Sequence, residues 1–225
     1  MSGAPTPVDV VSVVVVLTNL ALLGASRLGL AVRIVALQGC AVGLLPWLAH
    51  LDDPTAHVVA LSAAVLALKG IVFPRFLNRA LRDAEVRREE EPYVGYSTSL
   101  LLGVALLAVA LWCGARLPLP GRATPSFGVA VALSTLLTGL LLLVARRSAL
   151  HQVIGYLVFE NGIFGFGVPL VRDNPLLVEM GVLLDVFVGV FVMGITLFHL
   201  QRDLRHLSAD RLSALRDSDL KDSEP

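Results

Sequence analysis

Two apolar stretches near the end of the sequence decide the fold: ALHQVIGYLVFENGIFGFGVPLV, residues Ala149–Val171, and PLLVEMGVLLDVFVGVFVMGITLFHL, residues Pro175–Leu200. About 20 apolar residues at roughly 1.5 Å each cross the ~30 Å hydrocarbon core of a bilayer, so each stretch is long enough to span it. Only residues 172–174 join the two stretches. We therefore expect a tight antiparallel hairpin of two membrane-spanning helices.

Each of these two helices carries a carboxylate deep inside it. Glu160 and Asp185 lie at matched distances from the joining turn, and at helical rise each is about 15 Å below the same membrane face. An ionisable residue near the midplane costs at least about 2.5–3.5 kcal/mol on insertion scales, so a functional role is the default hypothesis. The alternative is a structural polar pair, such as a protonated acid bonded to Asn161.

A polar ladder leads to the first of these acids. Gln152, Tyr156 and Glu160 recur at four-residue spacing, which places them on one face of a helix. The ladder runs from the Arg146–Arg147 end of the helix to the midplane. We expect Gln152 and Tyr156 to order the approach to the acid.

Small residues accompany both acids. Gly181 and Gly189 share a helical face with Asp185, and Gly162 follows Glu160 closely. Small residues let a neighbouring helix approach closely inside a membrane. These glycines therefore predict helix packing around both carboxylates.

Three further ionisable residues lie within the expected helices, and each has two interpretations. Lys69 is about 20 Å deep in its span, where it either pairs with a carboxylate or extends its ammonium towards the near interface. Glu179 is either the outer end of a proton path or an interfacial acid. His199 either passes protons near neutral pH or anchors the helix at the interface.

The composition is that of a membrane protein without a cofactor. Of 225 residues, 56% are hydrophobic and 16% are charged, against about 25% charged in soluble domains. The formal net charge of zero gives no indication of nucleic-acid binding, so we predict no nucleic-acid partner. Cys40 and Cys113 lie in separate apolar runs and the histidines form no metal-binding motif, so we predict no metal and no cofactor.

Hydropathy predicts an all-α fold, a polytopic integral membrane helical bundle of about seven transmembrane helices. The expected spans are roughly 8–26, 30–50, 56–77, 97–115, 125–145, 149–171 and 175–200. Lys and Arg gather at alternate span ends, so the positive-inside rule predicts the N-terminus outside and the C-terminus inside. The chain then divides into three helices in 1–77, a charged cytoplasmic connector in 78–96, four helices in 97–200 and a charged cytoplasmic tail in 201–225. The connector is either a solvated link or a docking surface.

The stretches from His151 to Gly167 and from Leu177 to Ile195 resemble hydrogenase-4 component E, a membrane subunit of formate-hydrogenlyase-type nickel–iron hydrogenase complexes. The last three spans also resemble the small three-helix subunit of respiratory complex I and its relative in multisubunit sodium/proton antiporters. In that fold each of the last two helices carries a buried carboxylate used in proton transfer. The resemblance places these at Glu160 and Asp185, with aspartate where glutamate is usual and with Glu179 as a rival for the second position.

The resemblance implies a subunit of a complex-I-related respiratory complex in the inner membrane of a prokaryotic cell. Its carboxylates would contribute to proton translocation and couple the membrane arm to the redox arm, and the chain would not be an enzyme by itself. The implied partners are antiporter-like and other membrane subunits, a soluble hydrogenase or oxidoreductase arm, and membrane lipid. Two alternatives stay open: a stand-alone proton-coupled secondary transporter, and a structural scaffold whose acids are inert hydrogen-bond donors.

Overall fold

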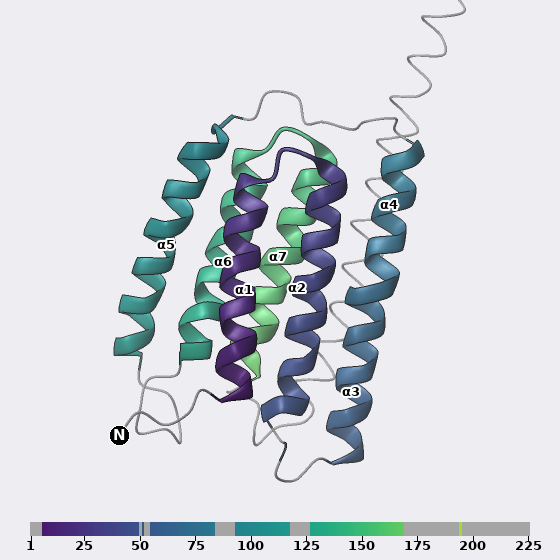
Figure 1. Cartoon of the computed structure of the whole chain (residues 1–225), viewed down its shortest axis with the longest axis vertical. Coiled ribbons are helices and arrows are strands. Elements are labelled where there is room, and N and C mark those ends of the chain that lie inside the picture. The colour runs from purple at the N-terminus through teal and green to yellow at the C-terminus, as the bar shows by residue number, and fades with distance from the viewer. Residues whose placement is uncertain are drawn as a thin grey trace, which may run out of the picture.

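The computed structural model describes residues 6–49, 51, 55–83, 93–117, 127–168 and 194, and the regular structure within them is entirely helical (Figure 1). The helices are α1 Pro7–Gly24, α2 Leu28–Ala49, α3 Ala56–Ala67, the π-helical turn η1 Leu68–Val72, α4 Phe73–Asp83, α5 Tyr96–Arg116, α6 Phe127–Ala145 and α7 Ala149–Gly167. The predicted all-α membrane bundle is thereby confirmed. The expected span 175–200 and the tail 201–225 lie outside the described residues, apart from Gly194.

Five helical segments in the described part of the chain are long and apolar enough to cross a membrane. They are Pro7–Gly24, Leu28–Ala49, Val58–Arg79, Tyr96–Arg116 and Phe127–Ala145. Large apolar side chains stand exposed on them, for example Leu101 at 72% and Trp112 at 57% on α5. Such surfaces are stable in hydrocarbon and costly in water, so the chain is a membrane protein.

Local sequence sets where the helices begin and how they turn. Thr6 and Asp9 form a reciprocal capping box at the start of α1, with Pro7 in the first turn. Thr55 accepts a hydrogen bond from the Val58 backbone N–H and caps α3. Only residues 25–27 separate α1 from α2, so these two helices are antiparallel neighbours.

The helices pack around α1, α2, α6 and α7. The most extensive pair is α6 with α7, and α1 packs against α2, α5 and α6. Helix α2 also contacts α7 and the long rod formed by α3, η1 and α4. In Figure 1, α5 and the α3–α4 rod stand at opposite sides of the bundle. The centre of the bundle is therefore shared by helices from both halves of the chain.

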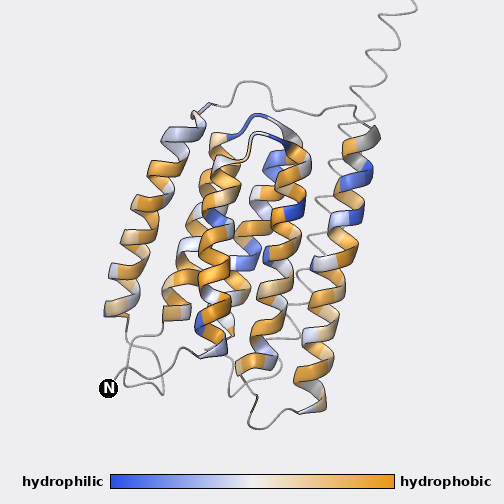
Figure 2. Ribbon diagram, viewed as in Figure 1, coloured by the Kyte–Doolittle hydropathy of each residue, from blue (hydrophilic) through white to orange (hydrophobic). Residues whose placement is uncertain are grey.

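A layer of polar side chains divides the core into two apolar clusters. The first cluster, at the end of the bundle where α1 meets α2, includes Leu23, Leu28, Val32, Phe73, Leu77, Leu142, Ile154 and Val158. The second, towards the Thr6 end, includes Val15, Ala41, Val42 and Val131. We call the buried polar side chains between them the polar layer: Thr18, Asn19, Gln38, Lys69, Thr135, Glu160 and Asn161. Figure 2 shows hydrophilic positions in the middle of the bundle with hydrophobic stretches on both sides.

The third membrane segment contains a π-helical turn that the sequence pattern did not indicate. Between α3 and α4 the helix widens at Leu68–Val72, and the Phe73 N–H bonds to the Leu68 carbonyl five residues earlier. Pro74 lies two residues after this turn. It has no N–H, and its ring would clash with the carbonyl four residues back in a regular helix. A π turn is a local adjustment by which membrane helices accommodate a proline.

Candidate functional site

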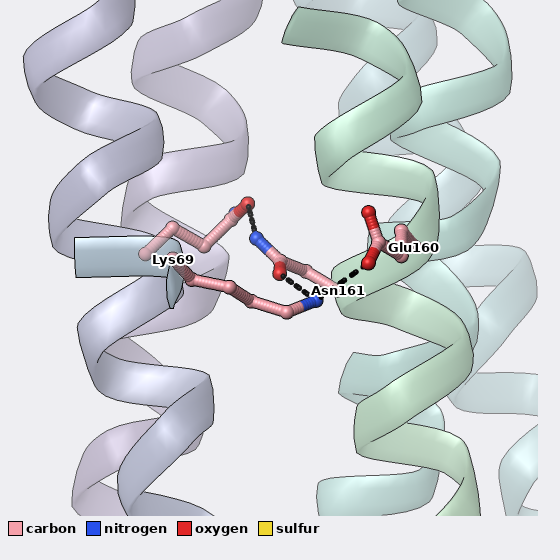
Figure 3. Close-up of polar contacts among 4 residues, drawn as sticks. Lys69, Glu160 and Asn161 are labelled. Carbon is pink, nitrogen blue, oxygen red and sulfur yellow. Dashed lines mark hydrogen bonds and ion pairs between the residues drawn. The ribbon is translucent and has the colours of Figure 1, made fainter. Parts of the chain in front are cut away.

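A buried ion pair forms the centre of the polar layer. The ammonium Nζ of Lys69, from η1, lies 3.2 Å from Oε1 of Glu160, from α7 (Figure 3). The two side chains are only 3% and 5% exposed. Of the two interpretations of Lys69, its position in the structure corresponds to the one in which it pairs with a carboxylate.

The lysine has further partners on α7. Its Nζ donates a second hydrogen bond, of 3.1 Å, to Oδ1 of Asn161 (Figure 3). It also lies 5.5 Å from the centroid of the Phe164 ring, at the face-on distance of a cation–π contact. Both contacts are of the kind that a cationic donor makes.

Amide side chains continue the polar layer across the bundle. Nδ2 of Asn161 donates to Oε1 of Gln38 on α2 at 3.2 Å. Nε2 of Gln38 then donates to Oδ1 of Asn19 at 2.8 Å and to the Thr18 hydroxyl at 3.1 Å, both on α1. Finally, Nδ2 of Asn19 donates to the Thr135 hydroxyl on α6 at 2.8 Å. Helices α1, α2, α6 and α7 and the turn η1 thus share one hydrogen-bonded layer.

Glycines bring η1 close enough to α2 for this layer to form. A Cβ atom added at Gly39 would lie 2.8 Å from Cβ of Lys69 and 3.3 Å from its carbonyl oxygen. A Cβ added at Gly43 would meet the Leu66 backbone nitrogen at 3.2 Å. Neither glycine has a side chain to keep α3 and η1 away, so the backbone of Lys69 can lie against α2.

Glycines also bring α6 against α7 next to the acid. A Cβ added at Gly162 would meet the backbone nitrogen of Leu136, and one added at Gly139 would meet the backbone nitrogen of Phe159. Gly155 is similarly close to Leu143. Backbone atoms cannot move aside as a flexible side chain can, so these contacts require glycine. They set the depth and rotation of α7, and hence the direction in which Glu160 points.

A small cavity lies beside the lysine. It has a volume of about 10 Å³ and is lined by Val35, Gly39, Lys69, Phe73, Pro74, Leu157 and Asn161. That volume is at the lower limit for one water molecule. Lys69 and Asn161 supply its polar lining, so the cavity could hold a single water in contact with Lys69.

The predicted polar ladder that leads from the Arg146 end of α7 to Glu160 is only partly buried. Tyr156 is half-buried, whereas Gln152 is exposed and donates to the Arg146 carbonyl at 3.3 Å. Arg146 is fully buried, and its guanidinium donates to the Leu23 carbonyl at 2.6 Å near the end of α1. The same guanidinium lies 4.4 Å from the centroid of the Tyr96 ring. Arg146 therefore joins α1, α5 and α6 at the end of the bundle opposite Thr6.

Several predicted site residues lie outside the described part of the chain. These are Asp185, Glu179 and His199, together with the glycines Gly181 and Gly189. Lys69, Glu160 and Gly162 meet in or beside the polar layer. Among the described residues, no group of three or more His, Cys, Asp or Glu side chains is placed to hold a metal ion.

Thr18, Asn19 and Thr135 belong to the polar layer although the apolar pattern of the sequence did not indicate them. All three are buried, at exposures of 5%, 3% and 1%. Each is a polar residue inside an apolar run of the sequence. Adjacent Thr18 and Asn19 could have been found by asking which polar residues lie within the expected spans, although their partners could not.

Comparisons with known proteins identify two kinds of relative. No family model matches the chain, and no solved structure matches it. Among curated proteins it is 34% identical over 189 residues to the uncharacterized protein Rv0085 of Mycobacterium tuberculosis, covering 83% of this chain and 85% of that protein. It is 28% identical over 155 residues to hydrogenase-4 component E of Escherichia coli and of Shigella flexneri, covering 69% of this chain and 72% of those proteins.

Proposed function

The chain belongs to the same family as the uncharacterized protein Rv0085 of Mycobacterium tuberculosis, and we propose that it is an integral membrane subunit of a hydrogenase-4-like respiratory complex. Its distant homology to hydrogenase-4 component E supports the complex, and its apolar helices support the membrane location. The complex would lie in the inner membrane of a prokaryotic cell, with this chain crossing it several times. The chain's partners would be antiporter-like and other membrane subunits and a soluble hydrogenase or oxidoreductase arm.

Within that complex, the chain takes part in proton translocation. The observation that carries this proposal is the Lys69–Glu160 ion pair, buried between two apolar clusters. Burial penalises the charged forms of both groups, whereas their mutual attraction favours those forms. Because these effects oppose each other, the proton can be held by the amine or by the carboxylate. A small change in the surroundings of the ion pair can therefore move the proton.

Asp185 is the proposed next carrier, at matched depth on the following stretch. Two carboxylates close together in low dielectric do not both ionise, so Glu160 and Asp185 would share protons alternately. Glu179 is the alternative second acid, and His199 would pass protons near the inner end of the same stretch. Tyr156 and Gln152 would order the inner approach, with the N-terminus outside and the C-terminus inside. Electron transfer would take place on other subunits.

The first experiment tests the assembly. The chain is tagged, extracted from native membranes in mild detergent, and the accompanying proteins are identified. We expect antiporter-like membrane subunits and a soluble oxidoreductase arm to accompany it in fixed proportion. Recovery of the chain alone, folded and monodisperse across several mild detergents, would instead favour a stand-alone transporter.

The second experiment tests the role of the acid. Glu160→Gln in the intact complex should abolish most of the proton translocation that depends on electron transfer, because the glutamine amide cannot take up and release a proton. Asp9→Asn is the matched control, since Asp9 is a partly exposed capping acid outside the polar layer. Unchanged translocation by an intact Glu160→Gln complex would contradict the proton role and favour a scaffold.

A further inference from the structure

Four side chains beyond the ion pair form what we call the amide chain: Asn161, Gln38, Asn19 and Thr135. We infer that the amide chain is a positioning device that keeps Lys69 protonated and does not itself carry the proton, which Glu160 can accept directly. The inference rests on the proposed function, in which Lys69 and Glu160 exchange a proton. It assigns roles to residues that the proton transfer itself does not use.

All hydrogen bonds of the amide chain point in one direction, and the lysine determines that direction. A protonated lysine can only donate, so Asn161 must present Oδ1 to the Lys69 ammonium. Nδ2 of Asn161 then faces Gln38 and donates to its Oε1. Gln38 therefore has only its Nε2 left to offer, which donates to Oδ1 of Asn19. Each amide orients the next.

The same direction of hydrogen bonding continues to the far end of the amide chain. Nδ2 of Asn19 donates to the hydroxyl oxygen of Thr135, and that hydroxyl donates to the Val131 carbonyl on its own helix at 2.8 Å. The amide chain therefore ends on a backbone acceptor within α6. Members of the amide chain are 0–3% exposed, so bulk solvent does not compete for their donors or acceptors.

This alignment stabilises positive charge at one end. Every amide turns its oxygen towards the lysine and its nitrogen away, so the side-chain dipoles reinforce one another at the ammonium. Aligned hydrogen bonds in low dielectric also polarise each other cooperatively. The amide chain thus favours the protonated form of Lys69, and Glu160 correspondingly stays ionised beside it.

The same alignment closes one route for the proton. Relay through an amide would require its oxygen to gain a hydrogen while its nitrogen loses one, and amide side chains do not titrate in the neutral range. The Glu160 carboxylate, 3.2 Å away, can accept directly. In that step the N–H bond of the ammonium breaks as an O–H bond forms on the carboxylate, leaving a neutral amine and a neutral acid. No other reactant is needed.

Infrared spectroscopy of the Glu160 carboxyl tests the positioning role. The full-length protein, purified with its accompanying subunits, is measured at pH 7, and the band of Glu160 is assigned by its loss in Glu160→Gln. We expect the carboxylate form in the unmodified protein. In Asn161→Leu the ratio of acid to carboxylate should rise about tenfold, since the ammonium loses a hydrogen bond.

Thr135→Val provides a gentler variant with a matched control. It removes only the last acceptor of the amide chain with almost no change of shape, so the same ratio should rise by a smaller factor. Thr138→Val makes the same substitution on the same helix at a similarly buried position, 3% exposed against 1%, and should leave the ratio unchanged. If Asn161→Leu fails to fold, the comparison of the two threonine variants decides.

Two results would overturn the inference. One is an unmodified protein in which Glu160 is already the acid at pH 7. The other is a folded Asn161→Leu or Thr135→Val variant with the ratio of the unmodified protein. Neither result depends on translocation, so failure of the positioning role is distinguishable from failure of the proposed function. A shifted ratio of acid to carboxylate in a protein that moves no protons would support the positioning role and contradict the proposed function.

Discussion

Lys69 and Glu160 are charged residues in the middle of a bundle whose neighbouring layers are apolar. Their pairing offsets the loss of hydration only because both are held by several contacts, among them Asn161 and the ring of Phe164. A buried ion pair is weak evidence for stability by itself. It is stronger evidence for a role in which charge must move, because an apolar pair of similar size would pack at least as well.

At the residue scale, we predict strong coupling between the two charges. Lys69→Met alone or Glu160→Gln alone should lower the free energy of unfolding by about 3–5 kcal/mol, since each leaves its partner buried without its counter-charge. The double variant should be clearly more stable than the sum of the single effects implies. Thermal unfolding in detergent compares the stability of the unmodified protein, the two single variants and the double variant. Additive effects would mean that the pair is not energetically coupled.

At the element scale, glycine contacts bring α7 against α6, in addition to the apolar side chains such as Ile154 and Val158 that α7 contributes to the core. We predict that Gly162→Ala lowers the free energy of unfolding by about 1–3 kcal/mol, because its Cβ would meet the backbone of Leu136. Gly167→Ala is the matched control on the same helix, since a Cβ there has nothing within 4 Å. Chemical unfolding in mixed micelles compares the two. Equal stability of both variants would show that the α6–α7 contact tolerates a side chain.

The π turn is the second feature of this scale, and it sets the face on which Lys69 lies. Pro74→Ala removes the reason for the widened turn, so the segment should relax towards a regular helix. Loss of one residue from a turn rotates the flanking segment by about 100°, which would direct Lys69 away from α7. We expect the infrared band of Glu160 to change from carboxylate to acid while helix content by circular dichroism stays constant.

Pro46→Ala is the control for this variant, because Pro46 lies inside α2 away from the ion pair. It makes the same substitution in a neighbouring membrane helix and should leave the Glu160 band in its carboxylate form. A carboxylate band that persists in Pro74→Ala would show that the turn is set by packing against Gly39 and not by the proline.

At the scale of the whole molecule, the basic ends of the helices predict the orientation in the membrane. In a cysteine-free background, Ser26→Cys, between α1 and α2, should react with an impermeant thiol reagent only after the cells are opened. Thr55→Cys, at the start of α3, should react in intact cells. Both positions are exposed, so burial does not explain a difference. The reverse pattern would invert the proposed topology and the direction of the proton path.

Much of the helical layout follows from sequence alone. The expected span 30–50 corresponds to α2 at Leu28–Ala49, and 125–145 corresponds to α6 at Phe127–Ala145. The third span was expected to end at residue 77, whereas its helix continues to Asp83. Hydropathy marks where a segment leaves the hydrocarbon, and a helix can continue past that point into water, so its end is less well predicted.

The sequence by itself determined that this protein is a membrane-embedded helical bundle and that Glu160 is a buried acid, because hydropathy and residue depth are local properties of each segment. Only the tertiary structure decided that Glu160 meets Lys69, 91 positions away, and that Gln38, Asn19 and Thr135 continue from them. Periodicity gives the polar face of a helix but not the neighbour towards which that face turns. That choice depends on close glycine contacts and on a π turn, and neither is encoded in the apolar pattern.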